Sequence, residues 1–486
     1  MKSGTCWAGR LLWVLCRVRD HALRVWPRAG TGSFFGPFWA EKCACPVARR
    51  GGQSHFRGLR GENRDSPRQR LPAIWAWTGT GRHWLHAVVM VFFGLACTAA
   101  ALGAQAPDPA DPQRPDAERV VPVDGPAFEA SLVAADRQWQ LTFRDADGNR
   151  RLPAQDLVRF GMWRELARGP LVLLADGSLL AAEVLSVNSQ HVVLDWRLGG
   201  EMKVARELVR AVALQPPAER LRREELLDAL LEAPARADQL LLVNGDRWEG
   251  TLESLADRKL RFFATLGPTE LELGRVRALV LHPELRPPIA PPGLRAVAGF
   301  RDGSRLVVET LRIEQGHLEA ITLGGLAVRT PAEALVALQP LGGRVTYLSD
   351  LMPAEYRHVP YLDLSWPFRR DRNVRGGWLR AGGRLYLKGL GVHSAARLTY
   401  RLEPPCRRFE AELAIDDHTA GRGSVGFRVF VDGQPRYTSP PVRGGQAPLP
   451  VAVDLTGAKR LDLVVDFGEG ADVLDDADWL DARLVR

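Results

Sequence analysis

The sequence predicts an all-β protein in which tandem small barrels of the SH3 or Sm-like kind precede a C-terminal jelly-roll β-sandwich. Two observations predict this fold class. Asx-Gly turns recur between short alternating strands in the middle of the chain, and longer alternating strands without intervening helices fill its C-terminal part. The 486 residues, 46% of them hydrophobic and 25% charged, are enough for several such globular domains.

The N-terminal segment, residues 1–82, shows no sustained hydrophobic period, so we expect it to be a disordered upstream extension that is not native. Residues 1–86 hold 15 Lys and Arg against 4 Asp and Glu, while the remainder holds 50 against 53. The net charge of +8 therefore comes from this segment. Without a basic folded surface, we expect no nucleic-acid partner.

An export signal is predicted at residues 83–106. A positive flank precedes the apolar run 87–101, and small residues follow it, as a signal peptidase requires. A membrane span is the alternative, because the apolar run 85–104 is about the minimum length that crosses a bilayer. We therefore expect a secreted, periplasmic or cell-envelope protein that contacts a membrane only if this segment stays uncleaved. The Pro- and Asp-rich residues 107–118 predict a linker.

Three similar units occupy residues 169–216, 238–283 and 294–341, and a looser copy occupies residues 119–161. Because four or five short strands cannot form a stable open sheet, each unit should curl into a small barrel. We predict type I′ hairpin turns, with positive φ at both central residues. These turns are Asp176-Gly177, Asn244-Gly245 and Asp302-Gly303. The barrels are expected to be spacers or interaction platforms rather than enzymes.

Two further segments separate these units. A helical insertion is predicted at residues 217–237, after the Pro-Pro pair that begins it. Its apolar stripe consists of Leu221, Leu226, Leu227, Leu230 and Leu231. Residues 284–293 are rich in proline and predict a stiff linker.

A β-sandwich is predicted for residues 344–486. Strict alternation over 409–415, 425–431 and 461–467 gives each strand one apolar face, which is typical of an antiparallel sandwich. In the last strand, Leu480, Ala482 and Leu484 share one face. This alternation puts Trp479 on the other face, off the main apolar row.

Five stretches of this region occur in the order seen in the NPCBM family of carbohydrate-binding modules. They are YLSDL (347–351), KGLGVHS (388–394), AIDD (414–417), GRGSVGFRVFVDG (421–433) and DDADWLDARL (475–484). The chain resembles that family over residues 344–486. The resemblance implies a galactose-binding-like sandwich in an exported protein, with binding of galactose-type sugars in some members and, often, a structural calcium ion. The family pattern has His where this chain has Asp476, so recognition that uses that His would be altered here.

The candidate sugar contacts combine an aromatic ring, which stacks on the apolar face of a sugar, with loop side chains that bind hydroxyl groups. They are Trp479, Asp478, His393, Arg422 and Asp417. Two alternatives stay open. Trp479 would plug the end of the sandwich, and His393 would fix a turn through a backbone carbonyl.

A structural calcium ion is the expected cofactor. Its candidate ligands are Asp416, Asp475 and Asp476, which do not follow an EF-hand spacing and would bind the ion across loops. The alternative is that these carboxylates are unpaired surface groups.

The predicted function is that of an exported, multi-modular, non-catalytic protein whose sandwich binds a glycan or polysaccharide. Two other functions stay open. One is a structural or protein-binding module of the cell envelope that lacks sugar binding. The other is a glycan-processing hydrolase, although no second acid at glycosidase distance is evident in the sequence.

Overall fold

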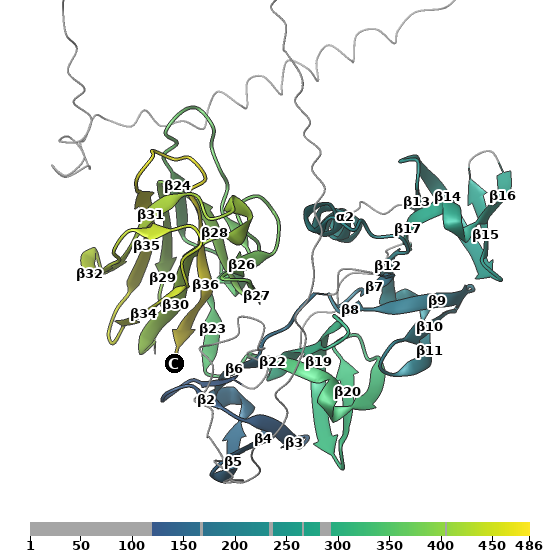
Figure 1. The fold of residues 1–486 in the computed structure, drawn as a ribbon, viewed down its shortest axis with the longest axis horizontal. Coiled ribbons are helices and arrows are strands. Elements are labelled where there is room, and N and C mark those ends of the chain that lie inside the picture. The colour runs from purple at the N-terminus through teal and green to yellow at the C-terminus, as the bar shows by residue number, and fades with distance from the viewer. Residues whose placement is uncertain (1–118, 166–168, 233–236, 265–266, 282–292, 404–405) are drawn as a thin grey trace, which may run out of the picture. The chain divides into compact units, whose positions relative to one another are not determined.

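The computed structural model describes residues 119–165, 169–232, 237–264, 267–281, 293–403 and 406–486 of the chain. The predicted extension at 1–82, the export signal at 83–106, the linker at 107–118 and all but the last residue of the linker at 284–293 lie outside the described residues. Across the described ranges, no helix is both long and apolar enough to cross a membrane. These ranges are almost entirely β-structure, as predicted, and contain one α-helix (Figure 1).

Four repeats precede the sandwich, and each ends with a short 3₁₀ turn followed by a closing strand. The first contains β1 (Arg119–Pro122), β2 (Phe128–Glu129), β3 (Ser131–Ala135), β4 (Gln140–Asp145), β5 (Gly148–Pro153) and β6 (Leu157–Gly161). The second contains β7 (Leu171–Leu174), β8 (Leu179–Leu180), β9 (Ala182–Val187), β10 (His191–Trp196), β11 (Gly200–Ala205) and β12 (Val209–Ala213). The third contains β13 (Asp238–Leu242), β14 (Arg247–Ala256), β15 (Lys259–Ala264), β16 (Gly267–Glu272) and β17 (Val276–Val280). The fourth contains β18 (Arg295–Phe300), β19 (Arg305–Glu314), β20 (His317–Thr322), β21 (Ala327–Pro331) and β22 (Leu335–Leu341).

The last strand of each repeat pairs with the first strand of the same repeat, in antiparallel β1–β6, β7–β12, β13–β17 and β18–β22 pairs. Strands of different repeats also pair, as β12–β17, β9–β14, β6–β22, β3–β19 and β8–β19. The result is one hydrogen-bonded network of 22 strands rather than a row of separate barrels. The likeness of each repeat to an SH3 or Sm barrel stays a prediction.

The Asx-Gly turns are present, but the prediction of type I′ geometry is wrong. Only the glycines have positive φ, at 87° for Gly177, 96° for Gly245 and 85° for Gly303. The Asp or Asn before each glycine stabilises the turn, because its side-chain oxygen accepts the backbone N–H of the residue that follows the glycine. These bonds are Ser178 N to Asp176 Oδ1 (2.8 Å), Asp246 N to Asn244 Oδ1 (3.1 Å) and Ser304 N to Asp302 Oδ1 (2.9 Å).

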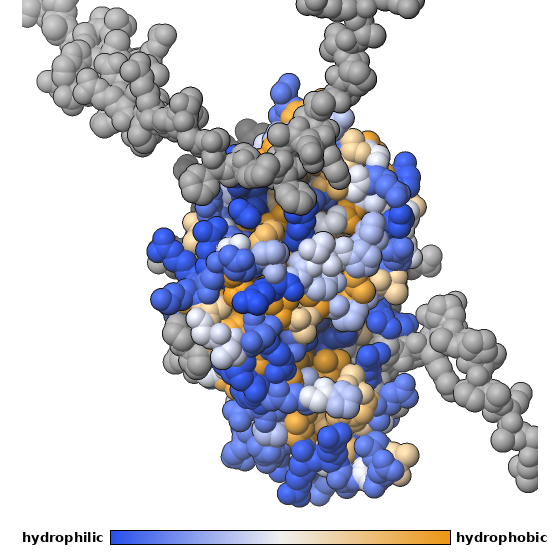
Figure 2. All heavy atoms as spheres, turned by 90° about the vertical axis from the view of Figure 1, so that its left-hand side faces the viewer, coloured by the Kyte–Doolittle hydropathy of each residue, from blue (hydrophilic) through white to orange (hydrophobic). Residues whose placement is uncertain are grey.

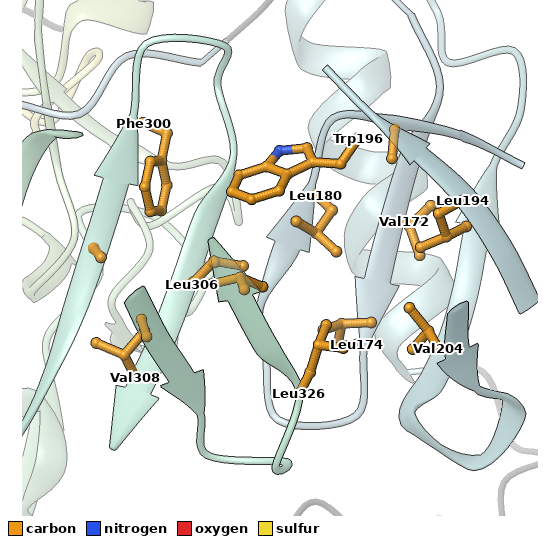
Figure 3. Packing of buried hydrophobic residues seen from close by; sticks show 14 of the residues in the cluster. Val172, Leu174, Leu180, Leu194, Trp196, Val204, Phe300, Leu306, Val308 and Leu326 are labelled. Atoms are coloured by element: carbon orange, nitrogen blue, oxygen red, sulfur yellow. The ribbon is translucent and has the colours of Figure 1, made fainter. Parts of the chain in front are cut away.

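The second and fourth repeats share a core, which Figure 3 shows at close range. Trp196 packs edge-on against Phe300, with ring centroids 5.6 Å apart. Its indole N–H donates to Asp302 Oδ2 (2.9 Å) and Ser304 Oγ (3.0 Å), so the buried polar atom has partners from the other repeat. A fused core of this kind explains why the repeats do not form separate domains.

Helix α2 (Arg220–Glu232) lies inside the segment predicted to be helical. Its buried face contains Leu227 and Leu230, but Leu221 is 47% exposed and Leu231 is 39% exposed, so the predicted apolar stripe is partly wrong. Arg223 and Glu224 are buried instead. They can be buried because Arg223 pairs with Glu165 and Glu224 pairs with Arg380.

Two six-stranded antiparallel sheets form the C-terminal sandwich, together with a two-stranded hairpin. One sheet has the order β25 (Arg369–Arg370), β28 (Gly389–His393), β36 (Asp476–Val485), β30 (Arg408–Ile415) and β34 (Leu449–Asp454), with β23 (Val345–Tyr347) on β36. The other has the order β24 (Glu355–His358), β29 (Ala396–Arg401), β35 (Arg460–Phe467), β31 (Ser424–Val431) and β32 (Gln434–Thr438), with β33 (Val442–Arg443) on β31. The hairpin is β26 (Leu379–Ala381) and β27 (Arg384–Tyr386).

The sandwich core confirms the alternation predicted for β30, β31 and β35, whose inward side chains lie in one buried cluster. The prediction for Trp479 in β36 is wrong. The pairing of β30 with β36 shifts register before Asp481, which has a φ of 46°. This irregularity changes the phase of alternation, so Ala477 and Trp479 before it and Ala482 and Leu484 after it all join the core.

Candidate functional site

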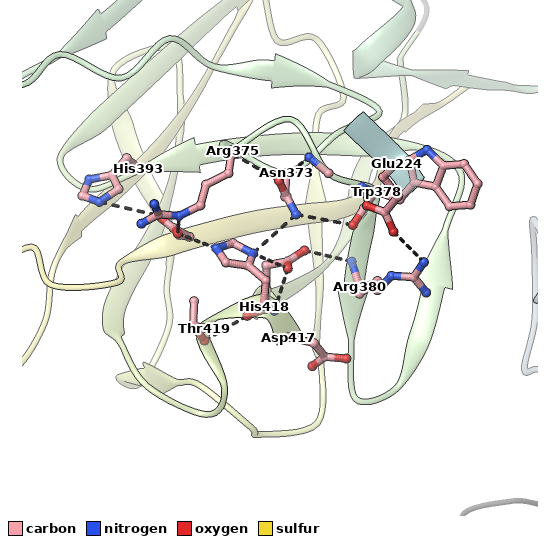
Figure 4. Close-up of polar contacts among 12 residues, drawn as sticks. Glu224, Asn373, Arg375, Trp378, Arg380, His393, Asp417, His418 and Thr419 are labelled. Carbon is pink, nitrogen blue, oxygen red and sulfur yellow. Dashed lines mark hydrogen bonds and ion pairs between the residues drawn. The ribbon is translucent and has the colours of Figure 1, made fainter. Parts of the chain in front are cut away.

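Five side chains from four separate segments meet at one end of the sandwich. Asp476 begins β36, and His418 belongs to the 3₁₀ turn Asp417–Thr419 that follows β30. Asn373 and Arg375 lie in the loop between β25 and β26, and Trp366 lies in the loop between β24 and β25. We call these five residues the Asp476 site; Figure 4 shows how Asn373, Arg375 and His418 converge.

His418 lies between two buried carboxylates. Its Nδ1 is 2.5 Å from Asp416 Oδ1, and its Nε2 is 2.6 Å from Asp476 Oδ2. Burial opposes the charged imidazolium, but hydrogen bonds to both carboxylates outweigh it and raise the pKa of His418 to about 9. The ring is therefore protonated at neutral pH and donates to both acids.

Arg375 provides the second positive charge of the Asp476 site. Its Nε donates to Asp476 Oδ2 at 2.6 Å, and its guanidinium lies 5.1 Å from the centroid of the Trp366 ring. Burial would raise the pKa of Asp476, but hydrogen bonds from His418 and Arg375 outweigh it and lower the pKa. The Arg375 side chain is 41% exposed and that of His418 is 19% exposed, so both cations reach the surface.

Asn373 holds the loop that carries Arg375. Its Oδ1 accepts the backbone N–H groups of Arg375 (3.1 Å) and Gly377 (2.9 Å), and its Nδ2 lies 3.4 Å from His418 Nδ1. Gly376 has a φ of 99°, a conformation that side chains other than glycine rarely adopt. This turn therefore depends on both the Asn and the Gly.

Two predicted sugar contacts, Trp479 and Asp478, have fully buried side chains, so neither is presented to a ligand in this structure. Trp479 packs against Phe427 and Phe409, with ring centroids 4.9 Å and 6.0 Å away. Burial and the negative charge of Asp416 raise the pKa of Asp478 well above its usual range.

The other three predicted contacts lie around the site but not at its centre. His393 is buried; its Nδ1 lies 2.9 Å from the Ser394 carbonyl oxygen, and its ring stacks on Trp366 with centroids 5.1 Å apart. Asp417 is half-buried and accepts the backbone N–H groups of Gly382 and Gly383. Arg422 is exposed. Sugar contact by these three side chains stays a prediction, and His393 matches the alternative of a turn-fixing His.

The residues expected to hold calcium do not fit that ion as they are placed. Asp416 and Asp476 already accept from the His418 imidazolium, and Asp476 also accepts from Arg375. Asp475 accepts Ser394 Oγ (2.8 Å) and Ser424 N (3.0 Å), and burial raises its pKa to about 6. Within the part of the chain that the structure describes, no group of three or more His, Cys, Asp or Glu side chains could hold a metal ion.

Sequence reasoning missed His418, Asn373 and Arg375 as site residues. His418 directly follows the AIDD stretch, which was a usable signal. Asn373 and Arg375 lie in a basic, Gly-containing loop between Trp366 and Trp378, which was a weaker signal, because their role depends on this loop meeting Asp476 a hundred residues later in the chain. The site can offer a ligand the exposed Arg375 guanidinium, which lies beside the Trp366 ring.

The NPCBM/NEW2 domain model matches residues 344–485. Over 107 residues, 22% of this chain, it is 37% identical to a protein of Renibacterium salmoninarum named "Putative endo-alpha-N-acetylgalactosaminidase". Over 173 residues, 34% of this chain, it is 28% identical to alpha-1,3-galactosidase B of Akkermansia muciniphila. These matches span only 7% and 18% of the two relatives.

Among solved structures, the chain is similar to CBM51 from the Clostridium perfringens GH95 protein in complex with methyl-galactose. The identity is 26% and the TM-score 0.27, over 29% of this chain and 99% of that chain. Because the family model covers the whole C-terminal sandwich, residues 344–485 form an NPCBM/NEW2 domain.

Proposed function

We propose that the NPCBM/NEW2 domain binds galactose-type glycans through the Asp476 site, as the non-catalytic module of an exported protein. The observation that carries this proposal is the pairing of two surface-reaching cations, Arg375 and His418, with buried carboxylates and an aromatic ring. Arg375 suits hydroxyl groups as a fixed donor, because Asp476 holds it in place before the ligand arrives. His418 donates with both ring nitrogens to the acids and so fixes Asp476. The names of the two curated relatives support a galactose-type sugar.

The burial of the acids supports a binding role rather than glycoside hydrolysis. Asp416, Asp475, Asp476 and Asp478 are each at most 1% exposed. A glycosidase needs two carboxyl groups that flank the scissile bond, and these four side chains are buried away from the surface. Binding would be shallow and polar. On the face of the molecule drawn in Figure 2, hydrophilic residues predominate, with hydrophobic residues in smaller groups between them.

The experiment is a glycan array followed by calorimetric titration of the full chain. We expect Arg375→Ala to weaken binding at least about tenfold, because it removes a charge-assisted hydrogen bond to the sugar worth about 1.5–3 kcal/mol. His418→Ala should also weaken binding, because it removes a group that holds Asp476 and, through it, Arg375. Arg436→Ala is the matched control, since Arg436 is exposed on the edge strand β32. If all three variants bound sugar like the parent chain, the Asp476 site would be the wrong site.

A protein-binding module of the cell envelope is the second candidate. Exposed apolar side chains favour it, since Met352 is 72% exposed, Leu362 is 73% exposed and Leu364 is 63% exposed. An array without any bound glycan, together with capture of a purified envelope protein that Leu362→Ser abolishes, would favour this candidate. Release of free sugar from the arrayed glycans would instead favour a hydrolase.

A further inference from the structure

The loop between β25 and β26 connects the Asp476 site to helix α2. We call residues 371–380 the bridging loop. On the side of the site, Arg375 pairs with Asp476 at 2.6 Å, and the backbone N–H of Arg380 donates to Asp416 Oδ2 at 2.9 Å. The same ten residues therefore set the positions of two groups that hold His418.

Helix α2 holds the other side of the bridging loop through two carboxylates. Asp228 contacts Arg372 through both oxygens, with Oδ1 2.8 Å from Nη2 and Oδ2 3.3 Å from Nε. Glu224 Oε2 accepts the backbone N–H of Trp378 at 2.8 Å, and its Oε1 lies 2.9 Å from Arg380 Nη2. Figure 4 shows Glu224 beside Trp378 and Arg380.

Apolar packing accompanies these bonds. Trp378 packs against Trp163, which follows β6, with ring centroids 5.2 Å apart. Both rings belong to a buried cluster that also contains Leu227 and Leu230 of α2. The Glu224 side chain is 4% exposed, and its charge is compensated by Arg380. The buried, charge-compensated contacts of Glu224 are costly to break. The bidentate Asp228–Arg372 pair, with each side chain 25% exposed, adds a fixed geometry.

We propose that α2 is a positioning element of the Asp476 site, so that the binding unit comprises this helix as well as the NPCBM/NEW2 domain. The effect on sugar affinity rests on the proposed function; the effect on the bridging loop does not. Fixing a loop costs about 1–2 kcal/mol per residue in backbone entropy. Contacts with α2 offset this loss of backbone entropy before a ligand binds, so Arg375 and Asn373 are already in position.

The test is a charge exchange in the full chain, with Asp228→Arg, Arg372→Asp and the double variant. Hydrogen exchange of the amides of residues 376–380 is the ligand-independent readout. We expect each single variant to exchange these amides at least about tenfold faster, with β31 and β35 unchanged, and the double variant to recover the parent rates. The matched control is Glu219→Arg. Glu219 directly precedes α2 and pairs with Arg222 of the helix, and the two side chains are 61% and 72% exposed.

Sugar affinity is the second readout, with methyl galactoside as the probe. We expect the single variants to bind it at least about fivefold more weakly and the double variant to bind it like the parent. If the reversed charge in Asp228→Arg prevents folding, Asp228→Ala replaces it. We expect Asp228→Ala also to speed hydrogen exchange of the amides of residues 376–380. Exchange rates in Asp228→Arg and Asp228→Ala equal to those in Glu219→Arg would overturn the inference. If the single variants exchange faster but the parent chain binds no sugar, the inference about α2 is supported while the proposed function is refuted.

Discussion

Two charged networks lie on strand β36, and they differ in their access to water. Around Asp476, the side chains of Arg375 and His418 reach the surface. Around Asp481, Arg159 of the first repeat lies 3.3 Å from Asp481 Oδ2 and 3.1 Å from Glu412 Oε1.

The carboxylate at the centre of the second network, Asp481, is enclosed by protein. Asp481 is 2% exposed, and Gln339 of the fourth repeat donates to its Oδ1 at 3.2 Å. Burial alone would lower the pKa of Arg159, but Asp481 and Glu412 outweigh it and raise the pKa. Residue types alone therefore do not assign a role on β36. Asp481 is bound by residues of the first and fourth repeats, whereas the Arg375 side chain that binds Asp476 is 41% exposed and open to a ligand.

The largest expected effect tests the residue between the two networks, Trp479. We expect Trp479→Ala to lower the free energy of unfolding by about 5 kcal/mol, the upper part of the range for a fully buried Trp. Denaturant unfolding measures this loss. Trp366→Ala is the matched control, because Trp366 is half-buried, and it should cost about 1–2 kcal/mol. Equal losses in the two variants would contradict the assignment of Trp479 to the core.

A smaller loss is expected at the closed network. Arg159→Ala leaves the buried Asp481 without its cation, and we expect a loss of about 3 kcal/mol in the free energy of unfolding. The partly exposed Glu412, at 24%, can regain water and so limits the cost. Denaturant unfolding measures this loss, with Arg436→Ala expected to stay within about 0.5 kcal/mol. A loss below about 1 kcal/mol in Arg159→Ala would mean that the network does not hold the repeats.

The open network should make stability depend on pH through His418. Its pKa in the folded protein is about 9 against 6.5 unfolded, so its stabilisation is complete below pH 6.5 and is lost as pH rises through 9. The expected decrease over that window is about 2 kcal/mol, since the side chain is partly exposed. Unfolding curves at pH 6 and pH 9.5 measure it. His418→Gln should flatten the pH dependence of the free energy of unfolding. An unchanged pH dependence in that variant would mean that another group titrates.

The smallest effect is expected at Asp475, whose pKa of about 6 in the folded protein exceeds its unfolded value of 3.8. Stability linked to this carboxyl is complete below pH 3.8 and is lost as pH rises through 6. Asp475→Asn keeps an acceptor for Ser424 N and removes the buried charge. We expect this variant to be about 1 kcal/mol more stable than the parent at pH 7.5 and equally stable at pH 3.5. A destabilised variant at pH 7.5 would show that the charge is needed.

The regular parts of this fold could be predicted from the sequence, because strands keep a period of two. Alternation therefore placed the inward side chains of β30, β31 and β35 in the core. It failed in β36, where the irregularity at Asp481 depends on pairing with β30, a segment 66 or more residues earlier. Local pattern carries no information on such a register shift.

The candidate site was less predictable than the fold. The sequence predicted Asp416, Asp476 and His393 as polar residues of the site. Their hydrogen-bond partners could not be predicted, because these depend on which segments the fold brings together. His418 pairs with an acid 58 residues away, and Glu224 reaches the bridging loop from 154 residues away. Pairs at such separations come from the tertiary fold, so a single sequence does not reveal them.

Strand pairing between the repeats constrains how this chain can be shortened. β12 bonds to β7 on one side and to β17 of the third repeat on the other, and β6 has the same arrangement with β1 and β22. Deleting a repeat would expose a row of unpaired N–H and C=O groups on a buried, apolar strand. Such an open edge templates association with other chains, so aggregation is the expected fate of single-repeat deletions.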